Sequence, residues 1–269
     1  MTVTSNVTVI SCLSENDMNV SFRKLTGDEK LGIEFFWKFS VDVKAGEKRM
    51  LNDQLIPELF FDFFHVAKGA VTVKTKGLRF SLPRQSLKTI FNQPVTLEYS
   101  APLVLYGARL SLKFAESFWG EMKANSLLTQ AWAGKEPKSL DAFAKQVGDH
   151  IRLNRKEKSP YPMFSKRLDE SDWLVNFSPR HKRRLYAAMF GLSRKELMNI
   201  RNVQSFLEQT CDFATQNPRI LHHVNPDVFY DQPHLNRSFK KMTGFSPVEY
   251  FEAHSLLQDN LMSASYNEV

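Results

Sequence analysis

Short apolar-rich runs and polar breaks alternate along the first part of the chain. The runs are TVTSNVTVIS, LGIEFFWKFSVDV, AVTVKTKGLRFSL, QPVTLEYS and PLVLYGARLSL. Several place Val, Thr, Phe, Tyr or Leu at every second position, which is typical of a strand with one buried face. The Lys68-Gly69 and Lys76-Gly77 pairs predict turns between them. Closely spaced strands of this kind predict an antiparallel sandwich or small barrel up to about Lys113.

The apolar spacing becomes helical after that point. FAESFWGEMKANSLLTQAWA and SLDAFAKQVGDHIRLN carry apolar residues on one helical face. In the second run Ser139 is a candidate N-cap, and Asp141 lies in the first turn, where a negative charge is favourable. The segment RKEKSPYPMFSKR, with two prolines among charged residues, predicts a linker.

Two stretches of the last hundred residues repeat one pattern. FSPRHKRRLYAAMFGLSRKEL begins at Phe177, and YDQPHLNRSFKKMTGFSPVEY begins at Tyr230. Each has a capping residue, an arginine six positions later, an aromatic residue two positions after that, and then a glycine, an apolar residue and a serine. The capping residues are Ser178 and Asp231, and the glycines are Gly191 and Gly244. Glycine supplies the left-handed conformation that ends a helix, so each stretch predicts a helix–glycine–helix unit.

The polar face of the second stretch has the chemistry of DNA recognition. Leu235 and Phe239 share one helical face and predict the buried side, while Gln232, Asn236 and Arg237 lie on the other. Amide side chains pair with adenine and guanidinium groups with guanine in the major groove. Lys240 and Lys241, at the far end of the same helix, suit phosphates.

Charge and composition support this interpretation without deciding it. The 269 residues have a net charge of +7, and the segment from Arg180 to Arg201 holds seven basic residues against one acid. A solvated helix face explains such a run equally well. No apolar run is long enough for a transmembrane helix, and the N-terminus has no signal-peptide pattern. Two cysteines, Cys12 and Cys211, make a disulfide framework improbable and favour a cytoplasmic location.

Other classes of function find less support. His65 is the one histidine before residue 150, His222 and His223 are adjacent, and no metal-ligand spacing occurs. No catalytic motif is present. Glu58 and Asp62 could share one face as a carboxylate pair, but exposed charges or inter-domain contacts are the preferred interpretation. Single-stranded or RNA binding is disfavoured because the aromatic residues near the basic run have core spacing.

The second stretch resembles the signature of the AraC/XylS-type transcriptional regulators, and SPRHKRRLYAAMFGLS resembles the first motif of that family. The N-terminal half is similar to the β-rich domain of one branch. The resemblance implies an α+β protein, with a β-rich sandwich- or barrel-like N-terminal domain followed by an all-α domain with two helix-turn-helix motifs. It implies a sequence-specific DNA-binding regulator that is not an enzyme and needs no cofactor. The DNA-binding residues that it implies are Arg180, Arg183, Arg184, Gln232, Asn236, Arg237, Lys240 and Lys241.

Three departures from the family pattern stand out. Lys182 occupies a position that is usually an apolar core residue, and Arg194 replaces the proline that usually follows Ser193. Ahead of the second motif, Val224 and Val228 stand where the family has a small residue and a turn glycine, and Pro226 would break the supporting helix. The supporting segments ESDWLVNF and RILHHVNP match the family poorly. We expect the Lys182 stem to lie along apolar surface while its charge reaches solvent or phosphate.

The resulting domain assignment is 1–113 for a β-rich sensor or dimerisation domain, 114–164 for a helical connector and linker, 165–255 for the DNA-binding domain, and 256–269 for a C-terminal tail. Double-stranded DNA is the expected partner. A small-molecule effector, RNA polymerase and a second copy of the chain are further candidate partners, and no membrane is expected. The alternative is a regulator-derived ligand- or protein-binding module whose DNA binding has weakened.

Overall fold

The N-terminal part consists of two antiparallel sheets. The structure, a computed structural model, describes residues 8–10, 14–15, 18–44, 47, 49–118, 136–155, 177–211, 232–253 and 255–266. The strands are β1 (Thr8–Ile10), β2 (Ser14–Glu15), β3 (Met18–Asp28), β4 (Ile33–Val43), β5 (Met50–Leu55), β6 (Phe61–Lys68), β7 (Val71–Thr75), β8 (Leu78–Ser81), β9 (Gln85–Lys88), β10 (Val95–Ser100) and β11 (Leu103–Leu110).

The long strands pair side by side in the first sheet. Within the described residues its order is β1-β3-β4-β11-β6-β9, with β2 also on β3, and the second sheet has the order β5-β10-β7-β8. Phe22 is paired with Phe39 across β3 and β4, so aromatic side chains line the ladder. The left-handed Gly77, with φ of 77°, closes the tight turn between β7 and β8.

Both faces of the first sheet are buried. Phe35, Trp37 and Phe39 of β4 face the second sheet and pack in the core between the sheets. Phe36, between them in sequence, faces the opposite way into a second core beneath the helices. A strand buried on both faces needs apolar residues at consecutive positions, which explains the run from Phe35 to Trp37.

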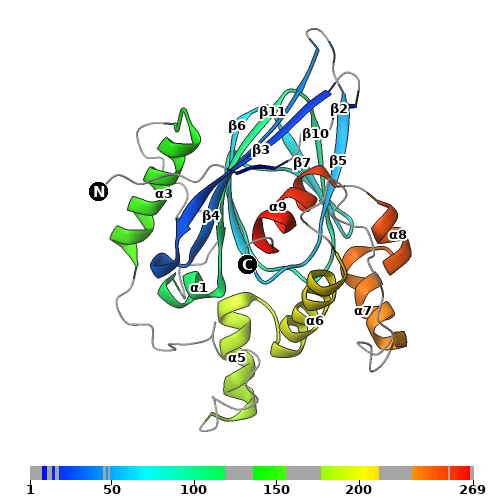
Figure 1. The fold of residues 1–269 in the computed structure, drawn as a ribbon. Coiled ribbons are helices and arrows are strands. Elements are labelled where there is room, and N and C mark those ends of the chain that lie inside the picture. Colours follow the sequence, from blue (N-terminus) through cyan, green and yellow to red (C-terminus); the bar gives the residue numbers. More distant parts are fainter. Residues whose placement is uncertain are drawn as a thin grey trace.

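The helices cover the outer face and one end of the β-rich part. They are η1 (Glu29–Leu31), α1 (Leu112–Phe118), α3 (Leu140–Asn154), α5 (Pro179–Phe190), α6 (Arg194–Thr210), α7 (Gln232–Thr243), α8 (Pro247–Glu252) and α9 (Leu256–Tyr266). Figure 1 shows α3 on the opposite side of the sheets from α7 and α8. Among the described residues no helix is long and apolar enough to cross a membrane.

The last helix packs into the β-rich part. Figure 1 shows α9, in red, within the curve of the strands. Leu257, Leu261 and Ala264 belong to the core between the sheets. Lys24 of β3 donates a hydrogen bond to the carbonyl of Ala264 at 2.8 Å. The residues that the sequence assigns to a C-terminal tail therefore include a helix that completes the core of the N-terminal part.

The β-rich N-terminal part and the helices that follow it are confirmed, with strands in each apolar run named above and α3 capped by Ser139. Strands β2, β3, β5, β6 and β9 lie outside those runs. Strands β3, β5 and β6 escape the pattern because they carry polar residues that are buried, such as Lys24, Asp53 and His65. The region 119–135 and the linker prediction across 156–167 lie outside the described residues.

A close approach between the paired strands β4 and β11 gives a test of this packing. A Cβ added at Gly107 would lie 2.0 Å from two ring atoms of the fully buried Trp37. We expect Gly107→Ala to lower the free energy of unfolding by about 1–3 kcal/mol, because the ring has no room to move. The control is Gly148→Ala in α3, where a Cβ meets nothing within 4 Å. That change should stabilise the helix by about 0.5–1 kcal/mol. Urea unfolding of both variants measures this, and an unchanged Gly107→Ala midpoint would contradict the packing.

Candidate nucleic-acid interface

The first helix–glycine–helix unit is α5, Gly191 and α6. The Ser178 hydroxyl accepts the backbone N–H of His181 at 3.3 Å and caps the start of α5. Pro179 occupies the first turn, where its missing N–H has no cost. Gly191 ends the helix with φ of 69°. Ser193 and Glu196 then cap α6 reciprocally, so a short helix and a long one meet at a fixed turn.

The second unit, α7, Gly244 and α8, repeats the geometry. Gly244 ends α7 with φ of 80°. The backbone N–H of Ser246 donates to Glu249 at 2.7 Å, and the N–H of Glu249 donates back to the Ser246 hydroxyl at 3.3 Å. Pro247 stands in the first turn of α8. The predicted left-handed glycines and the serine caps that follow them are confirmed in both units.

Each unit buries an apolar face that leaves its basic residues outside. Tyr186 and Phe239, the two equivalent aromatic residues, are both buried. Phe239 packs edge to face on Phe206 of α6 and Tyr250 of α8, with centroids 5.5 and 5.3 Å apart. The second unit is thereby fixed to the long helix of the first.

The predicted DNA-binding residues lie on the exposed faces of two helices. Exposed on α5 are Arg180, Arg183 and Arg184, and exposed on α7 are Asn236, Arg237, Lys240 and Lys241. Spacings of three or four residues bring the members of each set onto one helical face. Gln232 is the first residue of α7, and its side chain lies outside the described residues. DNA contact by these residues stays a prediction.

Two arginines at different ends of the interface are held in the same way. The Nε of Arg183 donates to the carbonyl of Pro179 at 3.4 Å, and the Nε of Arg237 donates to the carbonyl of Pro233 at 3.2 Å. In both cases the acceptor is the carbonyl of a proline four residues earlier. These bonds use Nε, so the two terminal nitrogens of each guanidinium stay available for an outside acceptor.

Lys182 and Leu235 occupy equivalent positions in the two units, and both are half-buried. Either an apolar residue or a lysine can occupy such a position, because a lysine can bury its methylenes while its ammonium stays near water.

The supporting segments ahead of both units lie outside the described residues. They include Trp173, Val224, Pro226 and Val228, and the predicted cap Asp231 lies outside the described residues as well.

Polar contacts join both units to the β-rich part. The Gln54 side chain donates to the carbonyl of Thr243 at the end of α7. Asn92 donates to Glu196 in the first turn of α6 at 2.6 Å. Gln204, in the middle of α6, accepts the backbone N–H of Leu59 at 3.0 Å. The exposed basic faces therefore have a defined orientation relative to the sheets.

A buried charge cluster lies behind these contacts. Arg109 is 2.5 Å from Glu58 and 3.7 Å from Asp62, and Lys88 is 2.5 Å from Asp62. Glu58, Asp62 and Arg109 are each 1% exposed or less. The interpretation of the two carboxylates as exposed charges is wrong. The other expectation, a contact between distant parts of the chain, holds for Glu58, which accepts hydrogen bonds from Gln258 and Tyr266 of α9. The two carboxylates raise the pKa of Arg109 above its usual range, against the opposing effect of burial, so the guanidinium stays charged.

The start of α9 is held by a second buried carboxylate. Asp53 accepts the Tyr99 hydroxyl at 2.5 Å, the Ser255 hydroxyl at 3.0 Å and the backbone N–H of Leu257 at 3.2 Å. Burial raises the pKa of Asp53, and these hydrogen bonds oppose the shift. The sequence signal for this contact was weak, because Asp53 and α9 are about two hundred residues apart.

Neither cluster resembles a metal centre. Across the described ranges no group of three or more His, Cys, Asp or Glu residues could hold a metal ion. His65 stacks on Tyr106 with ring centroids 6.1 Å apart and an interplanar angle of 4°. Burial lowers the pKa of this histidine, which favours its neutral form.

Comparisons with known proteins leave the family open. No family model matches the chain, and no curated protein matches it. The solved structures that it resembles include an apo ToxT variant from Vibrio cholerae, at a TM-score of 0.40 and 11% identity over 84% of this chain and 98% of that one. The AraC-like transcriptional activator CuxR follows at 0.35 and 7%, over 76% and 87%. A cupin 2 barrel protein from Rhodopseudomonas palustris is similar at 0.26 and 12%, over 40% and 72%. At TM-scores below 0.5 these likenesses assign no function to the chain.

The capping box at Ser193 gives a pH-dependent test of the first unit. The Glu196 carboxylate accepts the backbone N–H and the hydroxyl of Ser193, which lowers its pKa below the ordinary value of 4.5. A depressed pKa stabilises the fold above the ordinary value, and this stabilisation is lost as pH falls through the folded-state pKa. We expect Glu196→Gln to melt at a lower temperature than the parent at pH 7, and the difference to shrink by pH 3.

The control for this test is Glu252→Gln, at the exposed end of α8 and outside both capping boxes. It should show a smaller difference at pH 7. Thermal melts of the parent protein and the two variants at pH 3 and pH 7 measure these differences. An equal effect of Glu196→Gln at pH 3 and pH 7 would show that the charge of Glu196 does not stabilise α6.

Proposed function

We propose that this protein is a sequence-specific, double-stranded DNA-binding transcription regulator that reads adjacent major grooves with α5 and α7. The observation that carries the proposal is the repeated unit. Two short helices end at left-handed glycines, bury an equivalent aromatic residue and expose an equivalent arginine, Arg184 or Arg237. Each helix has 12 residues, which is about 18 Å of length, and the major groove is wide enough to admit the diameter of an α-helix.

The exposed groups divide into base readers and phosphate binders. Asn236 and Arg237 stand near the middle of α7, where an amide suits adenine and a guanidinium suits guanine. Lys240 and Lys241 stand in its last turn, where an ammonium group suits the backbone. On α5 the three arginines Arg180, Arg183 and Arg184 share one face and would supply the equivalent contacts. Neutralising phosphates releases counterions, so binding should depend steeply on salt.

The β-rich part would then have a regulatory role. Strand β5 and two loops next to the strands are joined to α6 and α7 by direct hydrogen bonds, so a change in the β-rich part would act on the orientation of both helices. A small-molecule effector and a second copy of the chain are the candidate ligands of this part, and RNA polymerase is a candidate partner of the whole protein. The proposed location is the cytoplasm, because a bacterial-type regulator meets the chromosome there.

Selection of binding sites from a random duplex pool tests the proposal, followed by two variants of α7. Arg237→Ala should weaken binding to the selected site by about 1–3 kcal/mol and relax discrimination at one base pair. Lys241→Ala, four residues further on the same helix, should weaken all sequences alike and reduce the salt slope by about one. Repeating the selection with both variants measures the difference.

Two outcomes would contradict the proposal in different ways. If Arg237→Ala weakened binding to every duplex equally, Arg237 would not read a base. Failure to enrich any sequence, together with a shallow salt dependence, would favour a regulator-derived binding module that no longer reads DNA.

A further inference from the structure

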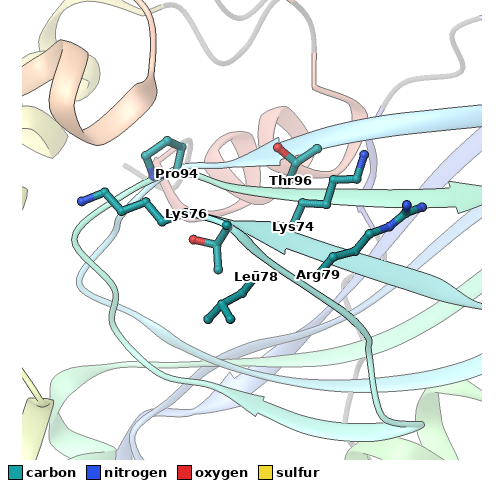
Figure 2. A pocket seen from close by; sticks show the side chains of 8 residues that line it. Lys74, Lys76, Leu78, Arg79, Pro94 and Thr96 are labelled. Atoms are coloured by element: carbon teal, nitrogen blue, oxygen red, sulfur yellow. The ribbon is translucent and has the colours of Figure 1, made fainter.

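The β7–β8 hairpin carries a basic pocket beside α7. The pocket has a volume of about 430 Å³ and is lined by Lys74, Thr75, Lys76, Gly77, Leu78, Arg79, Pro94 and Thr96. Figure 2 shows the side chains of Lys74 and Arg79 directed to one end and that of Lys76 to the other. The hairpin turn is exposed from Lys76 onward, so the pocket is open to a large partner.

The charge of this pocket is positive. Lys74 and Arg79 share one carboxylate, Glu98, with the Arg79 Nη2 at 3.2 Å from it. The side chains of Lys74 and Arg79 remain 43% and 68% exposed, whereas that of Glu98 is 15% exposed. Two cations against one partly covered carboxylate, together with exposed Lys76, leave a surplus of positive charge facing solvent. Two hydroxyls, from Thr75 and Thr96, add neutral donors for an anion.

One wall of the pocket touches the end of α7. A Cβ placed on Gly244 would lie 3.6 Å from Cγ of Pro94 and 3.3 Å from Nε2 of Gln54. Gly244 directly follows the last turn of α7, which carries Lys240 and Lys241. Pro94 therefore lines the pocket on one side and lies next to the end of α7 on the other. The basic residues of the hairpin and those of α7 therefore lie on either side of the contact between Pro94 and Gly244.

We propose that the β7–β8 hairpin binds the sugar–phosphate backbone of the same duplex that α7 reads, beyond the base pairs in the groove. This inference rests on the proposed function and extends the DNA contact to the β-rich part. A duplex backbone carries closely spaced charges along its length, which suits cations spread over an open hairpin. The contact is independent of sequence, because lysine and arginine would here meet phosphates and not base edges.

The experiment compares two duplexes centred on the selected site. The short one ends at the base pairs that the protein selects, and the long one continues by about one helical turn on each side. The parent protein should bind the long duplex more tightly. The double variant Lys76→Gln with Arg79→Gln should lose most of that advantage and keep the same base preferences. Its salt slope on the long duplex should fall by about 1.8, because each phosphate that the hairpin no longer neutralises lowers the slope by about 0.9.

The matched control is Lys30→Gln with Arg152→Gln. This pair removes the same charge from η1 and α3, which lie on the far side of the sheets from α7 and α8 in Figure 1. The control should keep the advantage of the long duplex. Thermal melts near that of the parent establish that both double variants are folded, as expected for exposed hairpin and helix positions.

Two results would overturn the inference, and they are distinguishable. If the hairpin variant and the control behave alike on both duplexes, the hairpin does not contact DNA, although the proposed function stands. If the parent protein binds neither duplex above its non-specific level, the proposed function fails and the inference fails with it.

Discussion

The arrangement of the sheets and helices depends on the interactions of one buried carboxylate, that of Glu58. It pairs with Arg109 of β11 and accepts hydrogen bonds from Gln258 and Tyr266 of α9, each at 3.0 Å. Gln204 of α6 donates to the same Tyr266 hydroxyl at 2.9 Å. A buried charge that is shielded from water needs a partner of opposite charge. Removing one partner of such a pair lowers the free energy of unfolding by about 3–5 kcal/mol. The sheet, the last helix and the long helix of the first unit therefore hold together as one network.

This network gives the β-rich part a direct influence on the basic helices. Gln204 connects to the loop between β5 and β6 through the N–H of Leu59, and to α9 through Tyr266. The same long helix, α6, supports α7 through the contact of Phe206 with Phe239. A ligand that altered the sheets or displaced α9 would change the support of α6 and α7 together. In the proposed function this is the route by which a signal would reach DNA.

Local patterns predicted local structure well. The alternation in VTLEYS and LVLYGARL corresponds to β10 and β11, and the glycines at 191 and 244 end their helices as their positions require. Exposure of the basic residues follows from the same periodicity, because Leu185, Tyr186, Met189 and Phe190 occupy the buried side of α5.

Long-range pairing was beyond a single sequence. The sequence favours exposed charges or inter-domain contacts for Glu58 and Asp62 without naming a partner, because Arg109 and Gln258 are far along the chain. The last helix carries Gln258, Asn260 and Ser263 among its buried residues, so its composition indicates a polar tail. Its place in the core becomes evident once Asp53 and Glu58 supply the matching acceptors.

The most direct test of the central claim is a methylation-protection footprint of one protomer on its selected duplex. Two recognition helices held in a fixed orientation should protect guanines in two major-groove segments on one face of the duplex, about 10 base pairs apart. Protection confined to a single segment would contradict the account, because it would show that α5 and α7 do not both enter the groove.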